Sequence, residues 1–153
     1  MILEYCSKGS LSSIIKSGDL KSQNEKIYYM KKIAEAIHFC HSKGIAHRDI
    51  KPNNVLLDDY VLPKLIDFGI CEMLYFNPDS ISSIDSNDGY YKAGKKGKVK
   101  LINKDFGTCS YLAPEIILNE PYDPFAADIW SLGVTFLKLQ LDLFLGHFNL
   151  KKR

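Results

Sequence analysis

The segment HRDIKPNNVLLDDYVLPKLIDFG, residues 47–69, limits the available folds more than any other part of the chain. Two short apolar runs, at Val55–Leu57 and near 64–66, predict a pair of strands with a turn at Asp58-Asp59 between them. Four polar side chains stand around these runs: Asp49, Lys51, Asn54 and Asp67. We therefore expect a small pair of strands with a cluster of polar groups beside it.

The chemistry of these four groups suits the handling of a metal-bound phosphate. The Asp49 carboxylate could accept a proton from an attacking hydroxyl, which contributes typically ~10²–10⁴-fold to a rate. Lys51 would neutralise charge on a transferred phosphoryl group, while Asn54 and Asp67 offer oxygen ligands of the kind that Mg²⁺ prefers. Gly69 lets the backbone turn away, so that Asp67 can point into a cleft. A plain turn is the alternative for Asp49, but its neighbours suit a simple hairpin poorly.

Apolar residues at helical spacing predict that most of the remaining chain is helical. SQNE at 22–25 matches a capping box and precedes a helix that runs to about Lys43. Shorter helices are expected at 11–17, stopped by Gly18, and after Pro114. The buried residues of the first long helix are expected to be Ile27, Met30, Ile33, Ala34, Ile37 and Cys40.

A last helix is expected at about 124–140, and it should form part of the core. Its buried residues are expected to be Ile129, Trp130, Leu132, Gly133, Phe136 and Leu139. Residues 2–6, ILEYC, predict a short buried strand. The expected fold class is therefore mostly α with short β-strands, an α+β arrangement.

The stretch 77–100 breaks this pattern, because Ser, Asn, Asp, Gly and Lys replace the apolar residues. We expect this polar insert to bury little and to lack regular structure. Within it, GYYKAGKK at 89–96 nearly matches a phosphate-binding loop, but Lys96 lacks the hydroxyl that would hold Mg²⁺. A lysine-rich, solvated loop is the preferred interpretation, with an acidic partner or an import signal as alternatives.

Composition narrows the classes of function. The net charge of +2 is small for the basic face that nucleic-acid binding usually needs, so we expect no nucleic-acid partner. Four cysteines without a C-x-x-C pair, and no secretory leader, favour an intracellular location, cytoplasmic or nuclear. Lys138 and Asp142 interrupt the apolar stretch at 129–150, so we expect no contact with a membrane.

A zinc site is an alternative use of four side chains: His38, Cys40, His41 and His47. His38 and His41 are three residues apart on one predicted helix, but no second ligand pair with familiar spacing follows. We expect instead that His38 and His41 lie on or near a helix surface.

The motifs HRDIKPNN, DFG, GTCSYLAPE and DIWSLGV occur in this order, and together they resemble the catalytic core of eukaryotic protein kinases. The Lys of HRDIKPNN and the Thr of GTCSYLAPE resemble the serine/threonine class. The resemblance extends from the hinge-like LEYC, at 3–6, to about Leu139.

The resemblance implies a role for each matching residue of the site. In a catalytic loop at 47–54, Asp49 would be the catalytic base and Lys51 the phosphate contact. Asn54 and Asp67 would hold Mg²⁺. ATP would also contact Leu3 as the gatekeeper, the backbone of Glu4 and Cys6 at the hinge, and Leu56 beneath the adenine ring.

The same resemblance implies supporting roles. His47 and Phe68 would belong to a packed internal spine, and Asp128 would anchor it by bonding to the backbone of the HRD motif. Thr108 would bond toward the catalytic Asp and Lys. Arg48 would engage a phosphate or an acid on an activation segment at 67–115, which begins with the Asp67-Phe68-Gly69 motif and contains the polar insert at about 77–100.

The matching motifs imply a partial protein kinase domain over 1–153: a kinase C-lobe, truncated, with the N-lobe absent. Glu115 would then lack the Arg that pairs with it in the family. The implied activity transfers the γ-phosphoryl of Mg-ATP to Ser or Thr hydroxyls of a protein substrate, with an activating kinase or regulatory protein as a further partner. The isolated 153-residue chain is expected to be weakly active or inactive. A non-catalytic, pseudokinase-like binding or scaffold module is the alternative.

Overall fold

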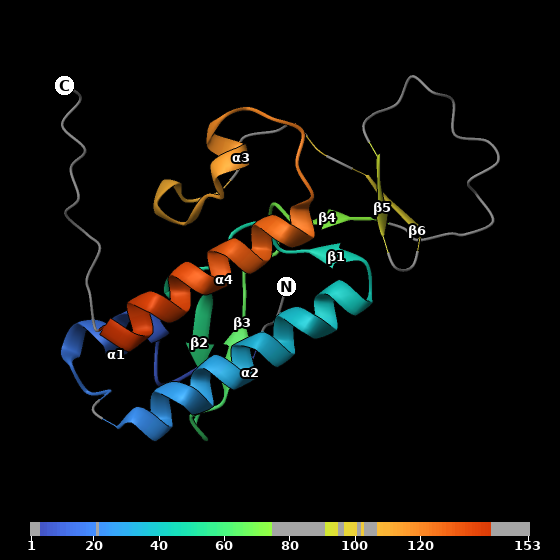
Figure 1. Cartoon of the computed structure of the whole chain (residues 1–153). Coiled ribbons are helices and arrows are strands. Elements are labelled where there is room, and N and C mark those ends of the chain that lie inside the picture. Colours follow the sequence, from blue (N-terminus) through green and yellow to red (C-terminus); the bar gives the residue numbers. More distant parts are fainter. Residues whose placement is uncertain are drawn as a thin grey trace, which may run out of the picture.

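Two long helices, α2 (Gln23–Ser42) and α4 (Pro124–Leu141), form the framework of the described part of the chain. They lie side by side and run in opposite directions in the computed structural model (Figure 1). The structure describes residues 4–20, 22–74, 91–94, 97–100, 102 and 107–141, of which 91–94 and 97–100 are described by their backbone alone. Helices joined by short strands make up these ranges, as the sequence predicts.

Local signals fix the helix ends where the sequence places them. Ser22 caps α2 in a capping box, in which its backbone N–H donates to the Glu25 carboxylate at 3.4 Å. Gly44 follows the helix with a φ of 74°, a left-handed conformation that glycine adopts readily. The short helix α1 (Leu11–Ser17) ends at Gly18 in the same way, with a φ of 70°. These predictions are confirmed.

Two pairs of short antiparallel strands lie beside the helices. β2 (Val55–Leu57) pairs with β3 (Pro63–Leu65), within one residue of the predicted ranges. β1 (Ile45–Ala46) pairs with β4 (Glu72–Met73), a contact that the sequence did not indicate because each strand has only two residues. Since β1 ends before residue 47 and β2 begins after Asn54, the two pairs hold the segment between them at both of its ends.

Two expectations about irregular and extended segments are wrong. Residues 4–6 of the predicted buried strand form no strand: Tyr5 is 81% exposed, and the Cys6 carbonyl accepts the Gly9 N–H in a turn instead. In the polar insert, β5 (Tyr91–Gly94) pairs with β6 (Gly97–Lys100) as an antiparallel hairpin. The glycines at its reversal favour such a turn, a signal that the polar composition obscured. The part of the insert at 77–90 lies outside the described residues.

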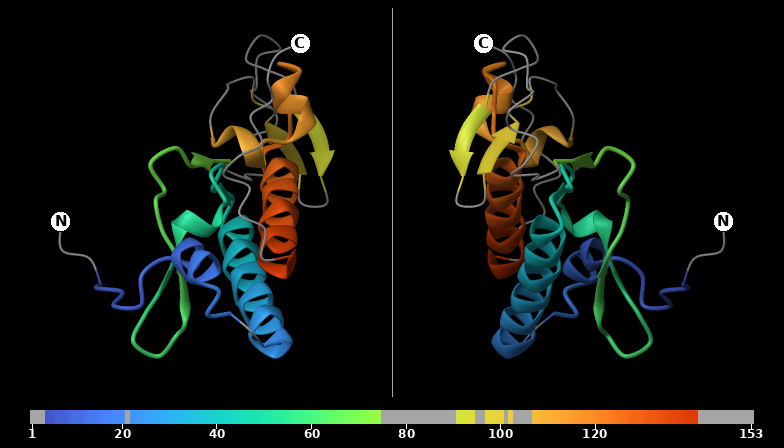
Figure 2. Two further views of the ribbon diagram at one scale, coloured as in Figure 1. Left: turned by 90° about the vertical axis from the view of Figure 1, so that its left-hand side faces the viewer. Right: turned by 90° about the vertical axis from the view of Figure 1, so that its right-hand side faces the viewer.

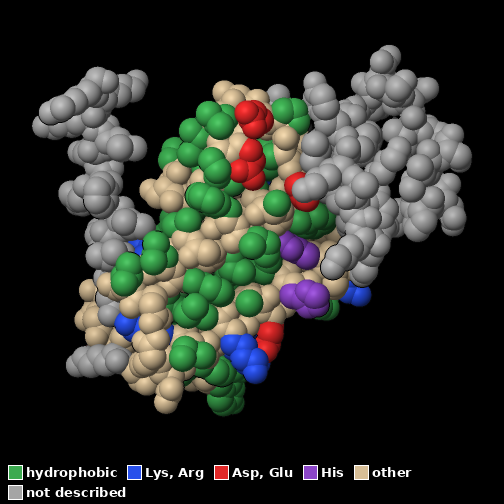
Figure 3. All heavy atoms as spheres, in the orientation of Figure 1, with side chains coloured by type: hydrophobic (Ala, Val, Ile, Leu, Met, Phe, Trp, Pro, Cys, Tyr) green, Lys and Arg blue, Asp and Glu red, His purple; other side chains and the backbone are tan. Residues whose placement is uncertain are grey.

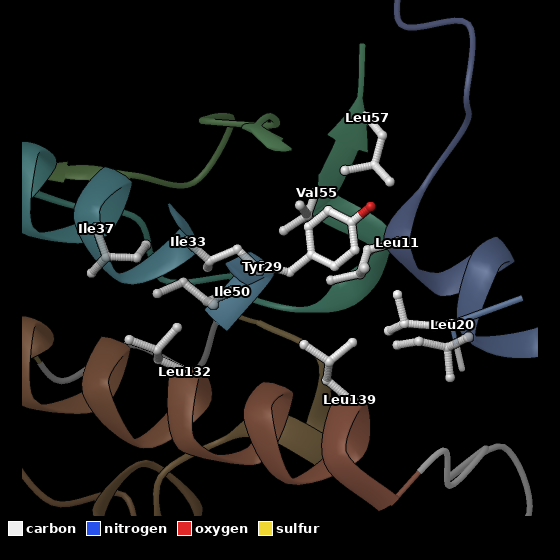
Figure 4. Close-up of a cluster of buried hydrophobic side chains, with 11 residues drawn as sticks. Leu11, Leu20, Tyr29, Ile33, Ile37, Ile50, Val55, Leu57, Leu132 and Leu139 are labelled. Atoms are coloured by element: carbon white, nitrogen blue, oxygen red, sulfur yellow. The ribbon is translucent and has the colours of Figure 1, made fainter. Parts of the chain in front are cut away.

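The main core forms where α1, α2, β2 and α4 meet (Figure 4). Figure 2 shows α2 between α4 on one side and the β2–β3 pair on the other. The core contains eleven buried apolar side chains: Leu11, Ile15, Leu20, Tyr29, Ile33, Ile37, Ile50, Val55, Leu57, Leu132 and Leu139. Ile50 lies in the middle of the polar segment 47–54, so the core itself fixes this segment in place.

A second, smaller core lies at the other end of α4. It includes Ile116 from the short helix α3 (Pro114–Ile117), together with Ala127 of α4. Ile102 and Tyr122 add to it through a pair of backbone hydrogen bonds of 3.0 Å. This cluster fastens the segment 107–117 to the first turns of α4.

The outer face of α4 is apolar and exposed. Ile129 and Trp130, both expected in the core, are 55% and 50% exposed, and Leu137 is 56% exposed. Gly133 is exposed on the same face, and Ile27 of α2 is also exposed at 53%. Figure 3 shows hydrophobic side chains over this region of the surface. Helical spacing identified the apolar residues of α4 but could not tell which of its two apolar faces packs against α2.

Candidate active site

Four polar side chains meet at the segment 47–54 and form one hydrogen-bonded cluster. The Lys51 ammonium donates to Asp49 Oδ2 at 2.6 Å and to Thr108 Oγ1 at 2.7 Å. The Thr108 hydroxyl in turn donates to Asp49 Oδ1 at 2.8 Å. Asn54 Nδ2 donates to the Asp49 carbonyl at 2.8 Å and to its Oδ2 at 2.9 Å. Both oxygens of the Asp49 carboxylate are therefore held in fixed positions.

The electrostatic surroundings keep Asp49 ionised. Burial raises the pKa of Asp49, but hydrogen bonds from Lys51, Thr108 and Asn54 outweigh it, so the pKa lies below the ordinary value for aspartate. The side chain is 11% exposed, so part of the carboxylate is accessible. An ionised, accessible carboxylate can orient and deprotonate a hydroxyl brought to it.

Asp128 of α4 holds the backbone at the start of the segment 47–54 through hydrogen bonds. Its buried carboxylate accepts the backbone N–H of His47 at 2.8 Å and that of Arg48 at 2.7 Å. His41 Nε2 lies 2.8 Å from the same carboxylate. His38 is exposed, as predicted, whereas His41 is half-buried, because the last turn of α2 places its ring against α4. The spacing of His38 and His41 in the sequence did not predict the contact between His41 and Asp128.

His47 joins the two halves of the polar segment. Its ring is fully buried, with Nε2 2.9 Å from the Ile66 carbonyl and Nδ1 accepting the Asp49 N–H at 3.2 Å. The Phe68 ring lies 4.7 Å from the His47 ring, centre to centre. His47 thus links the chain before Asp49 with the chain around Asp67, which the sequence separates.

Asn54 and Asp67 are the residues whose chemistry fits a magnesium ion. Asn54 is buried and directs its amide nitrogen to Asp49, which leaves its amide oxygen as the available ligand atom. The backbone carbonyl of Asn54 accepts the Ile66 N–H at 2.9 Å, so the segment that ends at Asn54 lies beside the segment that leads to Asp67. Asp67 is exposed, and its only hydrogen bond among the described residues comes from the Gly69 N–H at 3.3 Å. One neutral and one anionic oxygen form a donor set that suits Mg²⁺.

Arg48 contacts the predicted activation segment through side-chain and backbone groups. Its guanidinium donates to the Ile70 carbonyl at 3.3 Å and to the Glu72 carboxylate at 3.4 Å. It also donates to the Tyr122 hydroxyl at 3.3 Å. Glu72 is an acid within 67–115, the kind of group that the sequence led us to expect for Arg48. Neither Glu72 nor Tyr122 was singled out from the sequence, because no motif marks them.

The residues predicted for adenine binding are less tightly grouped. Leu3 lies outside the described residues. The Glu4 side chain is exposed and pairs with Lys64 at 3.3 Å, while Cys6 is half-buried. Leu56 is half-buried in β2 and forms a backbone bridge with Ser10. The structure thus places Leu56 on the strand that follows the polar cluster, and residues 4–6 in an irregular segment.

Glu115 lies away from the polar cluster, at an apolar groove on the outer face of α4. The groove has a volume of about 510 Å³, and its lining residues are Glu115, Ala126, Ile129, Trp130, Gly133, Val134 and Leu137. In the described part of the chain, no ion pair is formed by Glu115.

The described residues also bear on two alternatives that the sequence raised, a zinc site and a membrane-spanning helix. Within the described ranges, no three His, Cys, Asp or Glu side chains are grouped so that they could hold a metal ion, and this includes the four weighed for zinc. None of the helices described is both long enough and apolar enough to span a lipid bilayer.

Comparison with known proteins gives a consistent match. The model of the protein kinase domain family matches residues 1–147. CBL-interacting serine/threonine-protein kinase 15 of Arabidopsis thaliana is 33% identical over 138 residues, which are 90% of this chain and 28% of that protein. CBL-interacting protein kinase 24 of Oryza sativa subsp. japonica is 38% identical over 135 residues, 88% of this chain and 25% of that protein. The chain thus spans about a quarter of the length of these relatives. It belongs to the protein kinase domain family.

Proposed function

We propose that the chain forms the catalytic C-lobe of a serine/threonine protein kinase, which transfers the γ-phosphoryl of Mg-ATP to Ser or Thr hydroxyls of a protein substrate. The single observation that carries the proposal is the Asp49 carboxylate, ionised and held between Lys51, Thr108 and Asn54. Membership of the family supports the reaction class.

In the proposed reaction, the substrate hydroxyl oxygen forms a bond to the γ-phosphorus as the bond to the β,γ-bridging oxygen breaks. Asp49 orients the hydroxyl and takes its proton, and ADP leaves. Lys51 lies 2.6 Å from Asp49 and can also reach the charge that spreads over the transferred phosphoryl group. Thr108 keeps this pair in its geometry, because its hydroxyl contacts both side chains.

The cofactor sites follow from the same arrangement. Asn54 and Asp67 would hold Mg²⁺, which would neutralise phosphate charge when bound. Leu56 would lie beneath the adenine ring, with the backbone of Glu4 and Cys6, and with Leu3, at its edge. His47, Phe68 and Asp128 would fix the frame between the two halves of the site.

The proposed partners are proteins. The relatives named above are called CBL-interacting kinases, and this supports a regulatory protein as a partner of the present chain. The contact between Arg48 and Glu72 supports a role for Arg48 in ordering the activation segment. The four cysteines are free, which suits the proposed intracellular, cytoplasmic location.

The proposal is tested by Asp49→Asn in the full-length gene product, with transfer from labelled ATP to a protein substrate as the measurement. Loss of the base should lower kcat by about 10²–10⁴-fold. Asp19→Asn is the matched control, since Asp19 is an exposed aspartate outside the cluster, and it should retain full activity. If Asp49→Asn is as active as the wild type, the role of Asp49 is wrong. If the wild type binds protein partners but transfers no phosphoryl group, the scaffold alternative holds.

A further inference from the structure

Tyr111, in the short 3₁₀ turn Cys109–Tyr111, is held at both ends by side chains of α4. Ser131 Oγ donates to the Tyr111 carbonyl at 2.8 Å, and Lys138 Nζ donates to the Tyr111 hydroxyl at 2.9 Å. All three residues are buried, with exposed fractions of 5% for Tyr111 and 8% for Ser131 and Lys138. The turn is therefore attached to α4 at its backbone and at the tip of its only aromatic ring.

Lys138 is an unusual residue to find at this position. Burial lowers the pKa of Lys138, because the ammonium group loses contact with water. The ammonium also lies 5.4 Å from the centre of the Tyr111 ring. An apolar side chain of similar length would fill the same space without this desolvation, so packing alone does not account for a lysine here.

The turn that Lys138 holds carries a residue of the catalytic cluster. The Tyr111 N–H donates to the Thr108 carbonyl at 2.8 Å, which closes the turn onto Thr108. The Thr108 hydroxyl then contacts Asp49 and Lys51 at 2.8 and 2.7 Å. Burial raises the pKa of Tyr111 above the ordinary value for tyrosine, so its hydroxyl stays protonated and can accept from Lys138. A continuous path of hydrogen bonds and one turn thus connects α4 with the proposed base.

We propose that Lys138 is a positioning residue for the phosphoryl transfer, acting through Tyr111 and Thr108 to hold the Asp49 carboxylate in its reactive orientation. This rests on the proposed function. Without the bond to Tyr111, the turn loses its attachment to α4 at the ring and keeps the hydrogen bond from Ser131 at its backbone, so Thr108 can move away from Asp49. Asp49 then retains Lys51 and Asn54 as partners but loses the hydrogen bond that the Thr108 hydroxyl donates to its Oδ1.

The kinetic test uses Lys138→Met in the full-length gene product, with Lys31→Met as the matched control. Lys31 is an exposed lysine on α2, so the control makes the same chemical change away from the turn. Lys138→Met should lower kcat by about 10-fold, while KM for ATP stays within about twofold, as expected for an interaction that matters in the transition state. Lys138→Arg keeps a donor for Tyr111 and should recover most of kcat.

A merely structural role for Lys138 gives different results. Its effect on kcat would multiply with that of other changes, whereas Lys138→Met should add no further loss of kcat in a Thr108→Val background, because both changes break the same path. Independent, multiplying effects of the two substitutions would overturn the proposal.

A second measurement decides the matter without enzymatic activity. Hydrogen exchange of the Tyr111 amide should be about tenfold faster in Lys138→Met, while amides of α2 such as that of Ile37 keep their rates. Equal exchange at Tyr111 in both proteins, or an increase shared by α2, would overturn the positioning role. A wild-type protein that transfers no phosphoryl group would refute the proposed function, and the exchange experiment would still decide whether Lys138 holds the turn.

Discussion

The two parts of the site, the segment 47–54 and the segment 67–69, are built in opposite ways. In the first, the Asp49 carboxylate receives hydrogen bonds from three side chains, and Asp128 fixes the backbone next to it. In the second, Asp67 is exposed and receives one bond, at 3.3 Å, from the Gly69 N–H. Each part contains a non-glycine residue in the left-handed backbone region, Arg48 with a φ of 70° and Asp67 with a φ of 64°.

This difference teaches that the side of the site proposed to accept a proton is held by the described residues themselves, while the side proposed to bind the metal is left open. Among the described residues, a buried carboxylate binds the backbone beside this unfavourable conformation in the first case, whereas in the second case one hydrogen bond from Gly69 reaches the Asp67 side chain. We infer that the orientation of Asp67 is completed by its ligand, whereas that of Asp49 is complete beforehand. The comparison predicts how strongly changes in each part affect the free energy of unfolding.

The largest effect is expected for Asp128→Ala. The backbone N–H groups of His47 and Arg48 would both lose their acceptor in a buried place, and each such loss costs roughly 1–3 kcal/mol. The free energy of unfolding should fall by about 3 kcal/mol, measured by urea denaturation. Asp59→Ala removes an exposed aspartate and serves as the control, with little change expected. A loss as small as that of the control would show that the first part does not depend on Asp128.

An intermediate effect is expected for Gly107→Ala. Gly107 has a φ of 116°, and a Cβ there would lie 2.9 Å from the Arg48 carbonyl. Backbone strain and this contact should destabilise the protein by about 2 kcal/mol. Gly133→Ala is the matched control, because a Cβ in that exposed part of α4 meets nothing within 4 Å. Alanine favours the helix, so the control should gain up to about 1 kcal/mol, and the two melting temperatures should move in opposite directions.

The smallest effect on stability is expected for Asp67→Asn. Since Asp67 is exposed and nearly free of contacts, the free energy of unfolding should change by no more than about 0.5 kcal/mol. Transfer from Mg-ATP should nevertheless fall by about 100-fold or more, because the anionic ligand is lost. A melting curve and a magnesium titration of activity measure both quantities. A large drop in the melting temperature would contradict the open character of the second part.

Much of the fold could be predicted from local signals. Local signals mark these elements: the capping box at Ser22, the glycine at 18 and the apolar run Val55–Leu57. The candidate site was also recognisable, because Asp49 and Asn54 stand in one short motif and are joined by local bonds.

The missed features depend on contacts between distant segments. Trp130 has the hydrophobicity of a core residue, yet whether it is covered depends on what packs against α4 and not on its own helix. His41 and Lys138 looked like ordinary polar residues on helices, since their partners, Asp128 and Tyr111, are remote in the sequence. Glu72 gave no signal for the same reason, because its link to Arg48 arises only when β1 and β4 pair.

The anchoring of the segment 47–54 by Asp128 also has a consequence for biosynthesis. The two bonds from this carboxylate join residues that are 81 and 80 positions apart. During synthesis, His47 and Arg48 therefore leave the ribosome well before Asp128 is added. Their backbone N–H groups lack this acceptor until α4 has also emerged. Contacts of this range slow folding, so the interval before α4 appears is the period in which a chaperone would most benefit this chain.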